Sequence, residues 1–498
     1  MFIESFEEQR VLDEIDAAVG SLKNPRGLWH WSATEGLRRA GGAPERETHA
    51  PVAMLRAIAR TQERAVFVLS DLHAFLGGNT QPADPQTVRA LRDVVRDFRS
   101  GELARTIIVV APVLQIPPEL EKDVTVVDFP LPDAAEIRAL LAGMIARNGD
   151  SVSVRLDDRG RDRLTRAALG MTLAEAENAF SLAMVTGTSL TEADVDVVLA
   201  EKAQTIRKSG LLELVPTEVA LDDVGGLDAL KTWLDKRRDS WLAEAAAYGL
   251  PAPKGLLITG VPGCGKSLTA KAAAAAWGIP LIRLDIGRVF AGLVGASEHN
   301  MRTALATAEA CAPCVLWVDE IDKGFAGAGT ASDTGTSARV FGSFLAWLQE
   351  KTVPVFVMAT ANRIENLPPE FLRKGRFDEI FFVDLPDFAE RIEIWRLHLA
   401  RRPGPATGQE HTPELLWELA RISAGFSGAE IEQAVVSGLF EAYFDRRALT
   451  ARDLQHAVES TVPLSIVHAA RVNELREWAK LRTVPASKTA GGEGRIPE

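Results

Sequence analysis

A glycine-rich loop at Gly260–Ser267 constrains the fold of this chain more than any other feature. Its residues, Gly-Val-Pro-Gly-Cys-Gly-Lys-Ser, match the pattern G-x-x-x-x-G-K-[ST] in full. The apolar run Leu256–Thr259 precedes the loop, and an alanine-rich stretch typical of a helix follows it. Because a strand, this loop and a helix in that order form a phosphate-binding unit, we expect a parallel α/β core.

The loop predicts a nucleotide and a metal ion as ligands. Its backbone N–H groups can turn inward around phosphate oxygens, Lys266 can reach the β- and γ-phosphates, and the Ser267 hydroxyl can ligate Mg²⁺. The predicted cofactors are therefore ATP and Mg²⁺. The expected nucleotide-binding residues of the loop are Gly260, Val261, Pro262, Gly263, Cys264, Gly265, Lys266, Ser267 and Leu268.

An acidic pair follows a second apolar run. Val315–Val318 is typical of a buried strand, and Asp319 and Glu320 come directly after it. Asp319 is expected to hold Mg²⁺ through its water shell, and Glu320 to orient and deprotonate an attacking water. A pair that merely caps a helix is the alternative, which the phosphate-binding loop upstream disfavours.

Further segments, in a fixed order, resemble a known family. They are Asp222–Leu227 (DDVGGL), Ala359–Asn362 (ATAN), Phe371–Asp378 (FLRKGRFD) and Gly425–Glu430 (GFSGAE). Together with the loop and the acidic pair, these segments resemble the AAA-type ATPases of the AAA+ superfamily. The resemblance implies an α/β fold class, with a P-loop AAA+ parallel-sheet core and a C-terminal helical lid.

The resemblance also assigns roles to residues around one nucleotide. One segment lies against the adenine in the family, one packs near the nucleotide from the lid, and a polar residue at a strand end helps to position the attacking water. The residues that match are Asp223, Val224 and Gly225 for the adenine, Gly428 and Ala429 for the lid, and Asn362 for the polar position.

Two arginines, Arg373 and Arg376, resemble the arginine fingers of the family. Such fingers act on the ATP of the neighbouring subunit, so the resemblance implies a homo-oligomeric ring, which is a hexamer in the family. A trans arginine can accelerate phosphoryl transfer by several powers of ten. A solvated surface pair is the alternative and would contribute almost nothing.

One departure from the family concerns the central pore. Leu293 stands where threading enzymes of the family carry an aromatic residue. An aliphatic residue can still grip a client through apolar contact, so a threading ring and a non-threading ring both stay open. A second loop, Gly324–Ala338, is nearly all Gly, Ala, Ser and Thr, and we expect it to be mobile.

The N-terminal half resembles the same fold without its chemistry. Gly170–Glu175 parallels Gly425–Glu430, and Val66–Asp71 parallels the strand before Asp319. We favour a duplication over the strand patterns that any two α/β units share. This layout resembles the plastid- and cyanobacterium-type "hypothetical chloroplast frame" AAA proteins, which also occur in other bacteria.

The matching positions of the N-terminal half have lost the expected functional groups. The segment at 26–36 has no lysine, and it carries Trp29, His30 and Trp31 where phosphates would lie. In the sequence match Asp71 corresponds to Asp319, which places Leu72 at the position of the catalytic acid. We therefore expect a module that does not hydrolyse ATP and serves either as a partner-binding domain or as a scaffold.

Composition excludes several classes of protein. Lys+Arg 56 against Asp+Glu 68 gives a net charge of −12, which disfavours nucleic acid as a partner. Three cysteines suit a reducing compartment, so we expect a cytoplasmic protein, or a stromal one if it is plastid-encoded. The acidic N-terminus does not resemble an export signal, and no apolar run is long enough to insert into a membrane. Cys311 and Cys314 are expected to be core residues.

These features predict a domain plan and a function. The function is ATP hydrolysis by a ring-forming protein that remodels a protein client, bound through the N-terminal module or the central pore. A nucleotide-gated scaffold with little turnover is the alternative. The plan is a degenerate AAA-like module at 1–205, a linker at 206–219, the ATPase core at 220–386, a helical lid at 387–481 and a disordered tail at 482–498.

Overall fold

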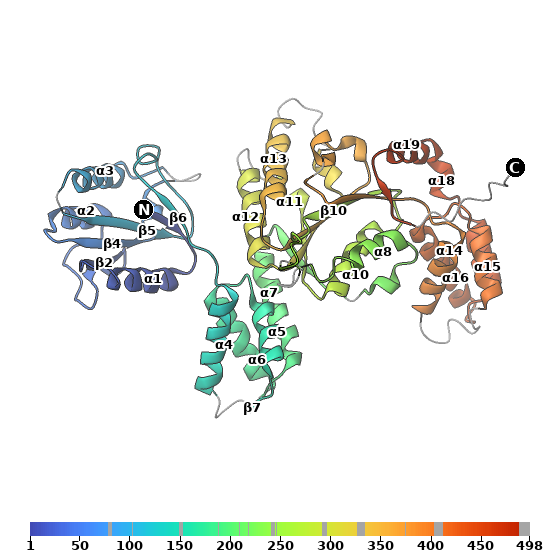
Figure 1. Cartoon of the computed structure of the whole chain (residues 1–498), viewed down its shortest axis with the longest axis horizontal. Helices are drawn as coiled ribbons and strands as arrows, with labels where there is room; N and C mark the ends of the chain where they lie inside the picture. Colours follow the sequence, from blue (N-terminus) through green and yellow to red (C-terminus); the bar gives the residue numbers. More distant parts are fainter. Residues whose placement is uncertain are drawn as a thin grey trace. The chain divides into compact units, whose positions relative to one another are not determined.

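A computed structural model shows that the chain folds into two compact units, residues 1–194 and 195–498 (Figure 1). It describes residues 1–77, 82–101, 103–148, 153–187, 189–208, 210–217, 219–240, 245, 247–290, 296–325, 334–373, 375–402 and 412–487. The pore position Leu293, most of the loop predicted to be mobile at 324–338, and the end of the predicted tail from 488 lie outside these ranges. Each unit is described separately.

The first unit begins with a six-stranded sheet in the order β3-β2-β4-β5-β1-β6. All neighbours are parallel except β2 and β3, which form an antiparallel hairpin. The strands are β1 (Phe2–Glu4), β2 (Gly27–Ser32), β3 (Gly36–Arg39), β4 (Ala65–Ser70), β5 (Arg105–Ala111) and β6 (Val126–Asp128).

Helices cover both faces of this sheet. Val11 and Ile15 of α1 (Glu8–Gly20) pack on one face, while α2 (Pro51–Arg60) and α3 (Pro85–Ser100) contribute to the core of the other face. A helical group follows in the same unit. It consists of α4 (Ala134–Asn148), α5 (Asp158–Ala168) and α6 (Leu173–Gly187), with the short parallel pair β7 (Ser153–Val154) and β8 (Ser189–Leu190).

The second unit is built on a seven-stranded sheet in the order β15-β14-β10-β13-β12-β11-β9. Every pair is parallel except β11 and β9. The strands are β9 (Leu212–Val215), β10 (Gly255–Gly260), β11 (Leu281–Leu284), β12 (Cys314–Val318), β13 (Val355–Ala361), β14 (Glu379–Val383) and β15 (Val484–Pro485). Strands β10, β12 and β13 are buried along their whole lengths, which explains their uninterrupted apolar sequences.

Two cores fill the two faces of this sheet. One face packs against α8 (Asp228–Asp235) and α10 (Lys266–Trp277). The other face packs against α7 (Val195–Lys208), α11 (Ile286–Phe290), α12 (Ala296–Ala310) and α13 (Thr334–Glu350).

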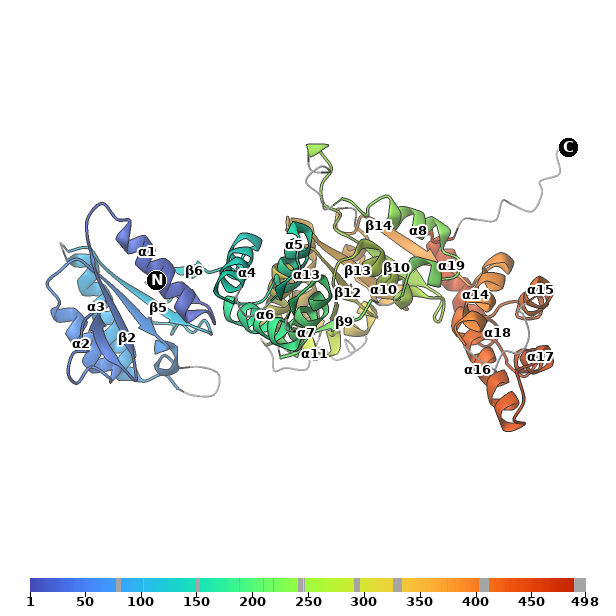
Figure 2. The same cartoon turned by 90° about the horizontal axis from the view of Figure 1, so that it is seen from below.

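A separate helical lid follows the sheet. It has its own apolar core, formed by α14 (Phe388–Ala400), α15 (Pro413–Ile422), α16 (Gly428–Phe444) and α17 (Ala451–Glu459). These helices gather at one end of the second sheet, away from α12 and α13 (Figures 1 and 2). After α18 (Leu464–Val467), α19 (Ala469–Ala479) returns to the sheet, where Leu475 and Ala479 join the main core.

The α/β fold class predicted from the sequence is confirmed, but three predicted boundaries differ from the structure. The first compact unit ends at Asp194 rather than at 205. The predicted linker contains β9, an edge strand in which Leu212 and Leu214 stand on either side of Glu213 and pair with Leu284 and Ile282 of β11. The predicted disordered tail begins with β15, and Ala486 is fully buried with its N–H donating to Phe382 O at 2.9 Å.

Among the described residues, no helix is both long enough and apolar enough to span a bilayer.

Candidate functional site

The predicted phosphate-binding loop connects β10 to α10. Gly260 ends the strand, and a Cβ there would lie 2.0 Å from Val383 O, so no larger residue fits. Gly263 and Gly265 have φ values of +78° and +87°, which L side chains rarely adopt. These two glycines let the chain turn tightly before α10 begins at Lys266.

Lys266 is buried beneath this loop. Its ammonium group donates hydrogen bonds to Gly260 O at 3.0 Å and to Val261 O at 2.9 Å. Burial lowers the pKa of Lys266 to about 8, because desolvation penalises its charged form. Its hydrogen-bond partners among the described residues are two neutral carbonyl groups, which leaves its charge available for an anion in the cavity.

The acidic pair lies beside the first turn of α10. Asp319 follows β12 directly, and its Oδ1 accepts a hydrogen bond from Ser267 Oγ at 2.9 Å. The two side chains come from residues that are far apart in sequence, yet they present a hydroxyl and a carboxylate oxygen at one point. Such hard oxygen ligands fit a Mg²⁺ ion, which takes few protein ligands and completes its shell with phosphates and water. No group of three His, Cys, Asp or Glu side chains in the described part of the chain forms a self-contained metal site.

Glu320 is held by contacts on its backbone and on both carboxylate oxygens. Its φ of +48° lies in the left-handed region, which is uncommon for a non-glycine residue. Oε1 accepts a hydrogen bond from Asn362 Nδ2 at 2.9 Å, and Oε2 forms an ion pair with Lys323. That ion pair raises the pKa of Lys323. The Glu320 carboxylate is thus fixed next to the end of β13.

Asp322 holds the backbone at Asn362 in place. Its carboxylate accepts hydrogen bonds from the backbone N–H groups of Asn362 at 3.1 Å and Arg363 at 3.2 Å. Asp322 is 4% exposed, and burial raises the pKa of its carboxyl. The turn after β12 and the turn after β13 therefore form one connected structure.

A cavity of about 570 Å³ collects most of the predicted site residues. They come from the segment before α8, the loop, the ends of β12 and β13, and the start of α16. The predicted residues on its wall are Asp223, Val224, Gly225, Pro262, Gly263, Cys264, Gly265, Lys266, Ser267, Leu268, Asp319, Glu320, Asn362, Gly428 and Ala429. Gly260 and Val261 do not line the cavity, and they support the loop through backbone contacts instead.

Helix α14 contributes a wall that the sequence analysis did not identify. Glu390, Ile394, Leu397, His398 and Arg401 all line the cavity and lie on one face of the helix. Their spacing of three and four residues is the signal that could have indicated a shared face. Thr360, Asp384, Pro386 and Glu432 were missed as well.

Lid and core contact each other directly around this cavity. At the lid, Ala429 N donates to Gly263 O at 3.0 Å. On the other side, Gly226 N donates to Glu393 at 2.8 Å and Leu227 N donates to Glu390 at 3.2 Å. A ligand in the cavity would touch both parts, so its presence can couple to lid position.

Comparison with known proteins gives the same assignment. Residues 256–385 match the model of the ATPase family associated with various cellular activities (AAA). Residues 1–129 and 135–209 match the N-terminal and second domains of SpoVK-like AAA ATPases. The AAA domain-containing protein ycf46 of Guillardia theta is 38% identical over 481 residues, which are 96% of this chain and 92% of that protein.

This chain belongs to the AAA ATPase family.

Other AAA relatives differ in how much of the chain they share. Ycf46 of Trieres chinensis is 37% identical over 487 residues, 96% of this chain and 93% of its own length. The proteasome-activating nucleotidase of Archaeoglobus fulgidus is 33% identical over 254 residues, 49% of this chain and 62% of its own length. The predicted resemblance to the chloroplast-frame AAA proteins is thereby confirmed over nearly the whole chain.

The two predicted arginine fingers of this AAA chain lie outside its own cavity. Arg373 is exposed directly after the short helical turn at Pro369–Leu372. Arg376 is half-buried, and its Nη1 donates to Glu370 O at 2.5 Å. Neither guanidinium lines the cavity that holds Lys266 and Glu320.

The three cysteines are free thiols. Cys264 lines the cavity, and burial raises the pKa of its thiol to about 12, so it stays protonated at neutral pH. Cys311 and Cys314 are buried in the main core, where desolvation raises both pKa values. Their thiols are therefore poor nucleophiles.

The structure corrects the match that we made in the N-terminal AAA-like unit. Asp71, not Leu72, is the counterpart of Glu320. Asp71 precedes a short 3₁₀-helix and has a φ of +56°, as Glu320 precedes one with +48°. Ser70 then corresponds to Asp319, and the fully buried Leu72 to the fully buried Ile321. The sequence match failed because it paired the aspartates, whereas the backbone turn sets the register.

A hairpin replaces the phosphate-binding loop in the first unit. Strand β2 turns back into β3 and pairs with it from Trp29 to Ser32. Trp31 is 1% exposed, with Nε1 donating to Thr48 O at 2.7 Å, so its ring is part of the core. The first helix after the hairpin begins only at Pro51. A cavity at this end of the first sheet is lined by Trp31, Ser32, Ser70 and Asp71 among others, and none of the described residues on its wall is a lysine.

Two helices of the first unit begin with the same kind of capping pair as two helices of the lid. A capping pair, Thr172 and Glu175, begins α6 as Ser427 and Glu430 begin α16. A second pair, Asp133 and Glu136, begins α4 as Asp387 and Glu390 begin α14. The equal order of sheet, turn and capped helices supports a duplicated AAA-like unit.

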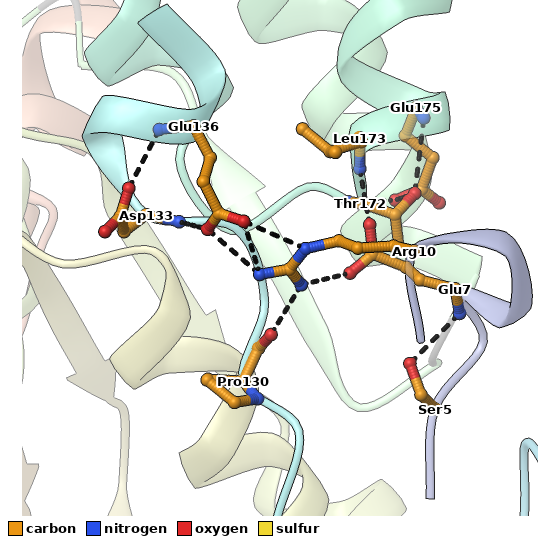
Figure 3. Close-up of polar contacts among 9 residues, drawn as sticks. All are labelled: Ser5, Glu7, Arg10, Pro130, Asp133, Glu136, Thr172, Leu173 and Glu175. Atoms are coloured by element: carbon orange, nitrogen blue, oxygen red, sulfur yellow. Dashed lines mark hydrogen bonds and ion pairs between the residues drawn. The ribbon is translucent and has the colours of Figure 1, made fainter. Parts of the chain in front are cut away.

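An arginine clamp joins sheet and helices in the first unit (Figure 3). Arg10 binds Glu136 through Nε and Nη2, with contacts from 2.8 to 3.1 Å. Its Nη1 donates to Glu7 at 2.9 Å and to Pro130 O at 2.7 Å. The Glu7 carboxylate also accepts from Leu173 N at 2.7 Å, at the start of α6. Side chains of the chain itself thus bridge the place where a ligand would join core and lid.

Proposed function

We propose that this AAA chain hydrolyses ATP to ADP and phosphate in a Mg²⁺-dependent reaction. The observation that carries the proposal is the placement of the Glu320 carboxylate. Asn362 Nδ2 holds it at 2.9 Å on the wall of the cavity that Lys266 and Ser267 also line. A base, a cation and a hard oxygen ligand around one cavity of nucleotide size suit phosphoryl transfer to water.

The proposed mechanism assigns each side chain one task. The loop N–H groups and Lys266 bind the phosphates of ATP. Val224 and the cavity-lining face of α14 contact the adenine ring. Ser267 and Asp319 would hold Mg²⁺, which neutralises phosphate charge when bound. Asn362 orients the carboxylate of Glu320, which takes a proton from water as that water attacks the γ-phosphorus. The bond to the β-phosphate oxygen breaks, and ADP leaves.

We further propose that the reaction requires a ring, a hexamer by family resemblance. Arg373 and Arg376 lie outside their own cavity, which is expected if they act on the ATP of the adjacent subunit. The ring would remodel a protein client, recruited by the N-terminal unit or held in the central pore. Three free thiols and the acidic net charge of −12 favour a reducing cytoplasmic or stromal setting and disfavour nucleic acid.

A nucleotide-gated scaffold with little turnover is a second candidate. The ion pair between Glu320 and Lys323 favours it, because one oxygen of the carboxylate is turned toward the lysine rather than left free for a water molecule.

Turnover measurements separate the two candidates. ATP hydrolysis per subunit is measured against protein concentration, with mass photometry on the same samples. For the proposed ATPase, turnover rises as rings form, whereas a scaffold shows tight ATP binding with negligible turnover at every concentration. The substitution Lys266→Ala supplies the matched control, since it removes the phosphate-binding cation and should abolish both binding and turnover.

A further inference from the structure

Thr360 connects the two acids of the site. It lies on β13, directly after Ala359. Because Ala359 pairs with Val318 of β12, Thr360 comes beside Asp319, the residue that follows Val318. Its side chain is 1% exposed. The hydroxyl is therefore enclosed in protein beside Asp319 and Glu320, and it cannot exchange its partners for water freely.

One hydroxyl contacts both acidic residues. Thr360 Oγ1 donates to Asp319 Oδ1 at 2.6 Å and accepts from the backbone N–H of Glu320 at 2.9 Å. A hydroxyl has one proton to donate, so these two contacts fix its orientation. Asp319 Oδ1 is the same oxygen that accepts from Ser267 Oγ.

The contact to Glu320 has a second consequence. Glu320 adopts a left-handed backbone with a φ of +48°, which is unfavourable for a glutamate unless its surroundings hold it. Its N–H points to Thr360 rather than to a backbone carbonyl. This geometry directs the side chain toward Asn362 and the cavity.

The first unit supplies a natural comparison. Ser70 pairs with Val110 in the sheet register, so Val110 occupies the position of Thr360. There the N–H of Asp71 donates to Val110 O at 2.9 Å, because no hydroxyl is available. The unit without a phosphate-binding loop has thus also lost this hydroxyl.

We propose that Thr360 is a positioning residue that orients Asp319 toward Mg²⁺ and Glu320 toward water. The proposal rests on the proposed ATPase function. It concerns a side chain that acts through the two acids and is not required to touch the substrate.

The chain offers a matched control for the test. Thr259 lies on β10, which pairs with β13, and it is fully buried. Its hydroxyl has no hydrogen-bond partner among the described residues. Threonine to valine replaces a hydroxyl with a methyl group of similar size, so Thr259→Val reports the effect of that swap in the same sheet without the contacts to the acids.

The experiment uses the full chain with Thr360→Val, Thr360→Ser and Thr259→Val. Affinity for a fluorescent ATP analogue is measured with Mg²⁺ and with EDTA, alongside kcat and thermal unfolding. We expect Thr360→Val to reduce the Mg²⁺-dependent gain in affinity about tenfold and kcat about 10- to 100-fold, typical of losing an outer-shell contact. Thr360→Ser should recover most of both, and Thr259→Val should match the wild type.

Wild-type Mg²⁺ dependence and kcat in folded Thr360→Val protein would overturn the proposal. If the valine variant does not fold, Thr360→Ala against Thr360→Ser decides, because the pair differs by the hydroxyl. If the wild-type chain shows no turnover, the proposed ATPase function fails on its own, and the Mg²⁺ dependence of binding still tests the role of Thr360.

Discussion

The two halves of this chain share a scaffold and differ at the strand ends. In the second unit a lysine-bearing loop follows one strand, and Asp319 and Glu320 follow another. In the first unit the corresponding places hold a hairpin and the residues Ser70 and Asp71. The buried strands and helix caps are alike, so the fold depends on the apolar pattern, while the chemistry depends on a few residues at one edge of the sheet.

The halves also differ in how core and lid are joined. In the second unit the two parts meet around an open cavity of about 570 Å³. In the first unit Arg10 and Glu7 bridge core and helices directly (Figure 3). A nucleotide bound in the second unit can therefore connect core and lid reversibly. In the first unit the side chains of the protein itself make this connection.

Loss of the proposed trans arginine should nearly abolish turnover. Arg373→Ala should lower turnover about 10³-fold or more, because the charge that stabilises the transferring phosphoryl group is lost. ATP binding should persist, since Arg373 does not line the cavity of its own chain. Steady-state hydrolysis and equilibrium binding on the same preparation check this, and unchanged turnover in the variant would exclude the finger role.

The next test replaces the equivalent acids of the two halves, one at a time, and compares the effects on turnover. Glu320→Gln should lower turnover about 10²- to 10⁴-fold through loss of the base, with ATP still bound. Asp71→Asn removes the counterpart in the first unit and should leave turnover at the wild-type value. Equal losses in both variants would show that the first unit takes part in hydrolysis.

Removal of the clamp should affect stability and not catalysis. Arg10 is largely buried with two carboxylates and a carbonyl, so Arg10→Ala should destabilise the first unit by about 2 kcal/mol. Hydrogen exchange at the starts of α4 and α6 should accelerate, while ATP turnover stays unchanged. Arg89→Ala breaks an exposed ion pair with Asp93 in the same unit and is the control, with an expected effect near zero.

ATP affinity should depend on pH through Lys266. Its pKa of about 8 means that the free protein loses this charge as the pH rises through 8, so affinity should fall on the alkaline side. Between pH 7.5 and pH 9 the protonated fraction drops about eightfold, and affinity should drop with it. Calorimetry in buffers of different ionisation enthalpy should detect proton uptake on binding.

Lys351 provides the control for this pH effect. Burial also lowers its pKa to about 8, but it does not line the cavity. In Lys351→Met protein the decline of affinity with pH should be the same as in the wild type. A flat profile for the wild-type chain would contradict the role given to Lys266.

The smallest expected effect comes from Lys323. Lys323→Met removes the ion-pair partner of Glu320 Oε2, which frees that oxygen for the attacking water and should raise turnover. The expected rise is only about twofold to fivefold, because an exposed ion pair is weak. Initial rates at saturating ATP measure this. A fall in turnover would instead show that Lys323 helps to place the carboxylate.

The loop and the acidic pair could be predicted from the sequence because phosphate and metal binding require fixed spacing between residues. Gly260–Ser267 and Asp319–Glu320 are local patterns, and the structure brings them to one cavity. The α14 wall and Thr360 depend on which helix and strand lie next to the loop, and that is set by packing. A single sequence carries only weak signals of such neighbours.

The errors have physical causes as well. Pairing Asp71 with Asp319 followed residue identity, while the left-handed turn at Asp71 sets the true register. The strand β15 was predicted as a disordered tail because two residues give no periodicity. Only the edge of β14 makes Val484–Pro485 a strand.

We propose that each chain has one nucleotide site, in its second unit. The most direct test is the stoichiometry of ATP binding, measured by calorimetry in Mg²⁺ for the wild-type full chain and for Lys266→Ala. We expect one nucleotide per chain in the wild type and none in the variant. Two nucleotides per wild-type chain, or one that persists in folded Lys266→Ala protein, would contradict it.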